Sequence, residues 1–146
     1  METFKNICVA LVCGFILTAL SVKLGSGFLD AFLQNNLIML LIALLAIHIT
    51  TLSVIMTKLK ELSDKYGQSF SNTIKEMKLS LYEHIVLIVL GLLVLILKES
   101  TVLDSVICNW SNACATLLSS ILIYSLVILY DTGKSVFEII DFEEKK

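Results

Sequence analysis

Long uncharged apolar runs alternate with short charged segments along the chain, and this alternation predicts the architecture. Four runs are long enough to cross a bilayer, because about 20 helical residues span the roughly 30 Å of hydrocarbon. Backbone groups in lipid must hydrogen-bond within their own segment, so each run is expected to be a helix. The runs cover residues 6–22, 31–57, 79–97 and 105–130. Residues 1–146 are therefore expected to form a single all-α domain with four transmembrane helices.

The placement of the lysines predicts how these helices are oriented. Cytoplasmic flanks of membrane proteins are rich in basic residues. With the N-terminus inside, nine of the 11 basic residues fall on the cytoplasmic side, and only Lys23 and Lys98 fall outside. Both termini are therefore predicted to be cytoplasmic. Lys5 and the small residues around Ser21 also fit a cleaved signal peptide, but the first run is long for one, so a retained helix is expected.

The longest connection is the segment 58–78, which we call the elbow. Its first part continues the helical period of the second run, and Gly67 is expected to end that helix. A further helix is expected to begin near Ser69 or Ser71, because either side chain can cap it. The elbow thus predicts a long helical hairpin that reaches into the cytoplasm. An apolar stripe on its second arm fits packing within the hairpin, contact with a partner, or contact with the lipid surface.

The segment 131–146, which we call the tail, has a smaller apolar patch followed by acidic residues. It is expected to be a short helix docked on the elbow or on a soluble partner, or else a frayed end. The charged and apolar positions of both segments are the candidate docking residues. They are Lys58, Lys60, Glu61, Asp64, Lys65, Phe70, Ile74, Met77, Val136, Ile139 and Ile140.

Three ionisable residues lie inside the predicted membrane helices: His48 in the second, and Glu83 and His84 near the start of the third. Charge is costly in lipid, so each is a candidate functional group. His48 can stay neutral and hydrogen-bond a Ser, a Thr or a carbonyl group. A proton relay from Glu83 to His48 is the alternative, but the two lie at different depths and no further acid continues the path. We expect structural hydrogen bonding.

Small residues follow one face of each of the first two helices, and polar residues follow one face of the fourth. Small faces let membrane helices approach closely, which predicts packing within the bundle or an oligomer. A polar stripe avoids lipid, so it is expected to line the bundle interior, a subunit interface or an aqueous path. The small positions are Ala10, Gly14 and Thr18, and then Ala43, Ala46, Thr50, Ser53 and Thr57. The polar stripe consists of Asn109, Asn112, Thr116, Ser119 and Ser120.

Composition narrows the classes of function. Apolar residues make up 57% of the chain and charged residues 16%, with a net charge of −2 and no Arg. This balance argues against a disordered chain and against direct nucleic-acid binding, which needs a basic patch. No common catalytic motif and no cysteine–histidine spacing typical of a metal site occurs. The sequence predicts a membrane protein that is not an enzyme and uses no cofactor or metal.

The stretch after the second run reads as Thr57-Lys58-Leu59-Lys60-Glu61-Leu62-Ser63-Asp64-Lys65-Tyr66-Gly67. With this stretch and its overall layout, the chain resembles small four-helix membrane proteins of bacterial anti-phage systems. It is similar to the membrane subunit of the Kiwa defence system and, less closely, to the lambda exclusion membrane protein. The resemblance implies a homo-oligomer in the bacterial inner membrane that senses membrane disturbance and recruits a cytoplasmic effector. It transfers no individual site residue.

Three hypotheses of function follow. The first is a non-enzymatic oligomeric scaffold or sensor in the lipid bilayer, which recruits a cytoplasmic protein partner through the elbow and the tail. The second is an oligomeric channel or pore-type effector lined by the polar stripe of the fourth helix. The third is an immunity or holin-like protein. The predicted docking surface of the first and the predicted lining of the second lie on different parts of the chain.

Overall fold

The computed structural model describes residues 2–67, 69–100 and 109–144, with side chains from Phe4 to Phe137 within these ranges. Four helices are long and apolar enough to cross a membrane. They are α1 (Glu2–Lys23), α2 (Phe28–Tyr66), α3 (Ser71–Lys98) and α5 (Trp110–Glu144). The predicted helical class and the four apolar spans are thereby confirmed, whereas the orientation in the membrane stays a prediction. Residues 105–108, at the start of the predicted fourth span, lie outside the described residues.

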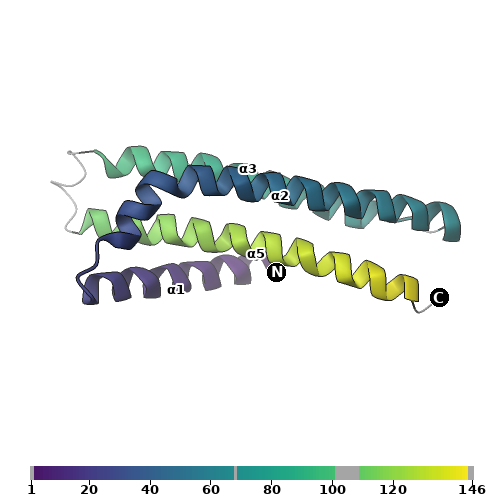
Figure 1. The fold of residues 1–146 in the computed structure, drawn as a ribbon, viewed down its shortest axis with the longest axis horizontal. Helices are drawn as coiled ribbons and strands as arrows, with labels where there is room; N and C mark the ends of the chain where they lie inside the picture. Colours follow the sequence, from purple (N-terminus) through teal and green to yellow (C-terminus); the bar gives the residue numbers. More distant parts are fainter. Residues whose placement is uncertain (1, 68, 101–108, 145–146) are drawn as a thin grey trace.

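Helix α5 is the centre of the bundle. It packs against α1, α2 and α3, whereas α1 makes only slight contact with α2. In Figure 1, α2 and α3 run side by side and α1 lies on the other side of α5. The core between these helices is apolar, with Leu33, Leu37, Leu41 and Leu118 fully buried. Burial of these leucines at every fourth position of α2 fixes which face of α2 turns inward.

Two helices are much longer than a bilayer requires. The 39 residues of α2 and the 35 of α5 correspond to roughly 58 Å and 52 Å, against roughly 30 Å of hydrocarbon. The excess lies at one end, because α1 begins beside the middle of α5 (Figure 1). There the Asn6 side-chain amide donates to the Asp131 carboxylate over 3.2 Å. Beyond that point α2, α3 and α5 continue without α1.

We call this three-helix extension the stalk; it comprises residues 52–66 of α2, 71–80 of α3 and 131–144 of α5. It has an apolar core of its own. Leu52, Ile55, Leu59 and Met77 are buried, and Phe70, Ile74, Leu81 and Val136 pack against them. Of the three alternatives for the apolar stripe of the elbow, the structure therefore selects packing within the hairpin, with α5 as a third helix.

The tail is helical and packs on the elbow through Val136, as one of the expectations stated, but it is the end of a long helix and not a short separate one. The backbone of α5 runs without a break through Glu144. The helix continues past Asp131 because Thr132 and Val136, one turn apart, both face the other stalk helices. The tail is thus the third helix of the stalk. Ile139 and Ile140 lie on this helix, but their side chains are outside the described residues.

The turn between α2 and α3 confirms one expectation and corrects another. Gly67 adopts a left-handed conformation with φ 64°, and its N–H donates to the Ser63 carbonyl over 2.8 Å. This is the predicted glycine stop, because a side chain would be strained at that φ. The expected cap by Ser69 or Ser71 is wrong. Phe70 occupies the cap position without a side-chain hydrogen bond, and its ring packs on the stalk core instead.

Candidate functional site: a buried histidine pair at the base of the stalk

Two histidines meet inside the bundle where the stalk begins. His48 of α2 and His84 of α3 are both fully buried, at 0% exposure. Their ring centroids lie 5.5 Å apart with the planes tilted by 38°. The sequence indicates each histidine separately, but it does not predict that the two lie side by side. The periods of α2 and α3 turn both rings toward the same interior position.

His48 is held by hydroxyl groups from two other helices. Its Nε2 lies 3.0 Å from the Thr132 hydroxyl of α5 and 3.2 Å from the Ser80 hydroxyl of α3. The Thr132 hydroxyl donates its proton to the Ile128 carbonyl over 2.9 Å. Toward His48 it must therefore accept, so we assign the proton of His48 to Nε2 and the lone pair to Nδ1. The expected hydrogen bonding of His48 to Ser and Thr is confirmed.

Three ring nitrogens of the pair are left over. His48 Nδ1 and both nitrogens of His84 are buried without a hydrogen-bond partner. The backbone of Leu41 lies next to the His84 ring, but no contact there completes a hydrogen bond of ordinary geometry. Each unsatisfied buried group costs about 1–3 kcal/mol. Most buried polar groups in proteins are satisfied, so this cluster of orphaned nitrogens calls for a specific explanation.

Acidic side chains surround two adjoining hollows on the stalk side of the pair. A hollow of about 330 Å³ and another of about 180 Å³ share Glu76, Ser80 and Asp131 in their walls. Glu83 also lines the larger one, where it accepts a hydrogen bond from the Tyr124 hydroxyl over 3.2 Å. Ser80 therefore contacts both the hollows and the His48 ring. Of the predicted relay residues, Glu83 shares a hollow with Ser80, and Ser80 contacts His48; the sequence did not indicate Ser80.

The polar stripe of α5 is largely satisfied within its own helix. The hydroxyls of Thr116, Ser119 and Ser120 each donate to the carbonyl one turn earlier, over 2.7–2.9 Å. Ser119 and Ser120 are buried, and α1 lies against this face. Gly14 makes that approach possible, because a Cβ built on it would lie 2.9 Å from the Ser120 nitrogen and from the Thr116 carbonyl oxygen. In the single chain the stripe lines a helix–helix contact.

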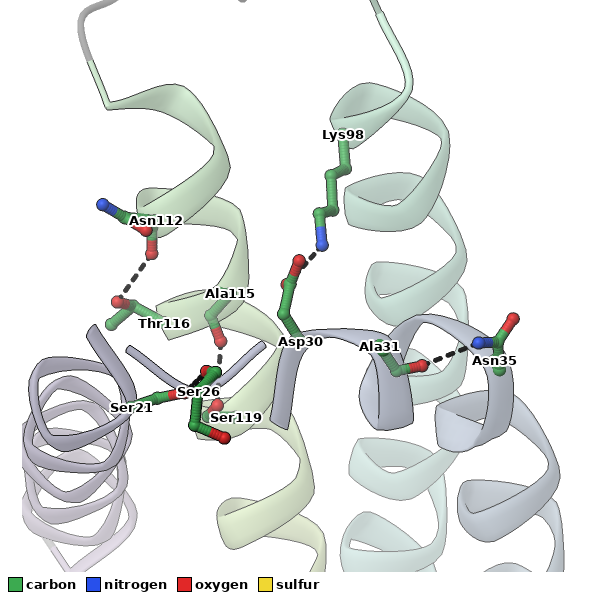
Figure 2. A network of polar contacts seen from close by, with 10 residues as sticks. All are labelled: Ser21, Ser26, Asp30, Ala31, Asn35, Lys98, Asn112, Ala115, Thr116 and Ser119. Carbon is green, nitrogen blue, oxygen red and sulfur yellow. Dashed lines mark hydrogen bonds and ion pairs between the residues drawn. The ribbon is translucent and has the colours of Figure 1, made fainter. Parts of the chain in front are cut away.

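The remaining stripe residues lie at the far end of the bundle from the stalk. Asn109 has a positive φ of 68° and precedes α5 rather than belonging to it. Asn112 is exposed, and its carbonyl accepts from Thr116, as Figure 2 shows. At this end the Lys98 ammonium pairs with the Asp30 carboxylate, which joins the end of α3 to the start of α2 (Figure 2). The ion pair was not predicted from the sequence.

The two small-residue faces differ in what they contact. Ala10, Gly14 and Thr18 of α1 are buried, and α1 packs chiefly on α5. The small positions of α2 instead point out of the single chain. Ala43, Ala46, Thr50, Ser53 and Thr57 are all exposed. Of these two faces, the one on α1 is buried by packing within the chain and the one on α2 is not.

The candidate docking residues fall into two groups. The apolar members Phe70, Ile74, Met77 and Val136 belong to the stalk core. The charged members are all exposed on the stalk surface: Lys58, Lys60, Glu61, Asp64 and Lys65. The apolar members therefore build the stalk, and the charged members cover it.

Ser80, Thr132 and Tyr124, which contribute to the histidine site, were not predicted from the sequence. Thr132 lies 84 positions from His48, and a threonine in a helix carries no signal of its own. The available signal was the helical period of α5, which places Thr132 one turn after Ile128 on the buried face. Comparisons with known proteins match no family model, no curated protein and no solved structure.

Proposed function

We propose that this chain is a non-enzymatic, oligomeric membrane scaffold or sensor that binds a cytoplasmic protein through its stalk. One observation carries the proposal. Three helices continue together well past the length that a bilayer requires, and they do so around an apolar core of their own. A packed extension of this kind holds its surface in a fixed shape, which favours specific recognition over loose contact.

The chemistry of the stalk surface supports a protein partner. Exposed charges of both signs are interspersed on α2, and Lys58 pairs with Glu61 over 2.7 Å. An exposed pair of this kind adds little stability, so its value lies in complementary contacts to a partner of mixed charge. The lysine count on this side fits a cytoplasmic location of the stalk. The partner is expected to carry acidic groups opposite Lys60 and Lys65.

The outward small-residue face of α2 supports the oligomeric part of the proposal. Ala46, Thr50 and Ser53 lie on one exposed face, and the two hydroxyls donate to carbonyls of their own helix. The face is therefore small and without unsatisfied hydrogen-bond donors. A second copy of α2 can approach such a surface closely, and close packing is what drives helix association in lipid.

A channel is the alternative, and the outer part of the α5 stripe is what favours it. An open hollow of about 820 Å³ lies between α1 and α5, with Asn112 and Thr116 in its wall. An ion path along the rest of the stripe requires α1 to move off Ser120, which lies against Gly14. Four helices do not enclose a wide pore, so this alternative also needs an oligomer.

The partner proposal is tested with a photo-crosslinking residue placed at Lys60 or Asp64 of the full chain in its native membrane. We expect one cytoplasmic protein to be captured at these positions and not at Ile42, which is exposed on the apolar part of α2. With the crosslinking residue at Asp64, Lys60→Glu with Lys65→Glu should abolish the capture, whereas Lys75→Glu on the α3 arm should preserve it. A chain that purifies as a monomer and captures nothing contradicts the proposal.

The channel alternative has a separate readout. Purified protein in liposomes should show no conductance under the scaffold proposal. Conductance that disappears in Asn112→Leu with Thr116→Leu, and survives the stalk variants, supports the channel instead. A role in anti-phage defence, which the resemblance suggests, belongs to the scaffold proposal. It predicts that the Lys60 and Lys65 variants lose protection of the host against phage while the protein remains in the membrane.

A further inference from the structure

We propose that the His48–His84 pair is a proton-binding site that takes up one proton per chain from the stalk side of the bundle. The inference does not depend on the stalk having a partner. It rests on the rings, the orphaned nitrogens and the acidic hollows, which together describe a site built for a small positive charge. The ligand is the proton itself, supplied by water in the hollows.

The orphaned nitrogens are the acceptor. A neutral histidine has one protonated and one unprotonated ring nitrogen, so each ring offers one lone pair. In the assigned tautomer the lone pair of His48 is on Nδ1, which has no hydrogen-bond donor facing it. Uptake adds one proton to one of these lone pairs and raises the charge of the pair from zero to one.

The pair holds one proton and not two. Two charged imidazoles at this separation repel each other strongly in a buried site, so the first proton opposes the second. The site fits a transition metal less well than a proton, because no group of three or more His, Cys, Asp or Glu side chains converges within the described part of the chain. Two imidazoles with neutral hydroxyl neighbours fit a single shared charge.

The charged groups on the stalk side of the pair line the two hollows and come from two helices. Helix α3 contributes Glu76 and Glu83, and α5 contributes Asp131, with the Tyr124 hydroxyl bonded to Glu83. Helix α2 has no charged residue between His48 and Lys58, and α1 contributes the neutral Asn6. Opposite charges nearby stabilise the charged form of a group. The carboxylates around the hollows therefore compensate the charge that the pair gains.

Ser80 provides the connection between the hollows and the rings. Its hydroxyl lines both hollows and lies 3.2 Å from His48 Nε2. Hydroxyl groups rotate and both donate and accept, so they exchange protons with an imidazole and with water. A proton delivered at this edge binds the Nε2 lone pair of His48 when the ring carries its other proton on Nδ1, so uptake proceeds through that tautomer. Thr132 holds the same edge in place from α5.

The path ends at the pair. Beyond the histidines, toward the end that carries Asp30 and Lys98, the facing helices hold no acid, lysine or histidine. This is true of residues 31–47 of α2, 85–97 of α3 and 110–130 of α5. A proton that enters from the stalk side has no onward carrier. The geometry therefore describes a binding site and not a conduction route. Protonation changes the contacts of the histidine rings at the point where the three stalk helices leave the bundle.

The test is nuclear magnetic resonance of the full chain in lipid nanodiscs with ¹⁵N-labelled histidine. The chain has two histidines, so every ring signal belongs to the pair. Between about pH 8 and about pH 5 we expect both rings to respond together, with one proton bound per chain. Rings that stay neutral throughout, or that bind two protons independently, overturn the proposal.

Substitutions in the walls of the hollows test the role of the carboxylates and leave both histidines unchanged. Glu76 and Asp131 are exposed, so Glu76→Gln with Asp131→Asn leaves the fold intact. The double variant should lower the proton affinity of the pair on the order of threefold to tenfold, because it removes compensating charge. Asp64→Asn, an exposed acid of the stalk outside both hollows, is the matched control and should leave the affinity unchanged. Equal affinities in the double variant and the control contradict the proposal.

Discussion

The small-residue face of α1 and that of α2 look alike in the sequence, yet they contact different surroundings. Ala10 and Gly14 of α1 are buried, and α1 packs chiefly on α5. Ala46 and Ser53 of α2 face outward. A face of small residues thus determines how closely another helix can approach, but not which helix does so. Which helix packs there depends on the other contacts that hold each helix in place.

Two further contacts hold α2 in place. Its buried leucines fill the core, and its first turn is tied to α3 by the Asp30–Lys98 pair. Helix α1 contributes Ala10 to this core and is held to α5 by the Asn6–Asp131 hydrogen bond and by close contact at Gly14. The small face of α1 is therefore needed for packing within the chain, whereas that of α2 is not covered within the single chain.

The largest expected effect comes from Gly14→Val. Any side chain there meets the α5 backbone at Ser120 and Thr116, so overpacking should destabilise the chain by about 3 kcal/mol and displace α1. Thermal unfolding in detergent, followed by the fluorescence of Trp110, measures the loss. Gly133→Ala is the control, because a Cβ at Gly133 meets nothing within 4 Å, and it should be neutral or slightly stabilising. Equal stability of the two variants would contradict the α1–α5 contact.

Breaking the tie of α2 to α3 should have the next largest effect. Asp30→Ala leaves the Lys98 ammonium unpaired, and its side chain is only 8% exposed, so about 2 kcal/mol of stability should be lost. Asp30→Ala with Lys98→Met removes both charges and should recover part of the loss. The same unfolding assay compares the variants. A double variant worse than the single one would show that the pair is not the source of the effect.

The α2 face should respond in oligomeric state rather than in stability. Ala46→Leu points away from the single chain, so we expect its unfolding free energy to change by less than about 0.5 kcal/mol. The larger side chain should nevertheless block close approach of a second copy and lower the mass measured by light scattering in detergent. Ala19→Leu, an exposed alanine of α1 outside its small face, should leave the mass unchanged. An unaltered mass in Ala46→Leu removes the support for an α2 interface.

The smallest expected effect is that of Ser120→Ala. Its hydroxyl donates within α5 to the Thr116 carbonyl over 2.7 Å, so the loss of this bond should cost about 0.5 kcal/mol or less. The reduced volume also relieves the contact with Gly14. Stability and liposome conductance should both stay close to those of the original chain. A large change in conductance would favour the channel alternative.

Periodicity predicted the parts of the fold that depend on one helix at a time. Apolar runs gave the four spans, and the glycine at position 67 gave the end of α2. Features that depend on the relative rotation of several helices were not predictable. The meeting of His48 with Thr132 needs three helices in register, and hydroxyl residues are too common for their positions to signal it. The hairpin of α2 and α3 in the stalk was predicted from the sequence. The continuation of α5 as its third helix was not, because that continuation depends on contacts with α2 and α3.

The central position of α5 also has a consequence for how the protein is made. Membrane helices enter the bilayer in chain order, and domains assemble as their segments are synthesised. Helix α1 is the first to emerge, but its packing partner is α5, the last of the four helices. During synthesis α1 must therefore wait in the lipid, with Gly14 uncovered, while α2 and α3 pair. Closure of the bundle is a late step, governed by the arrival of α5.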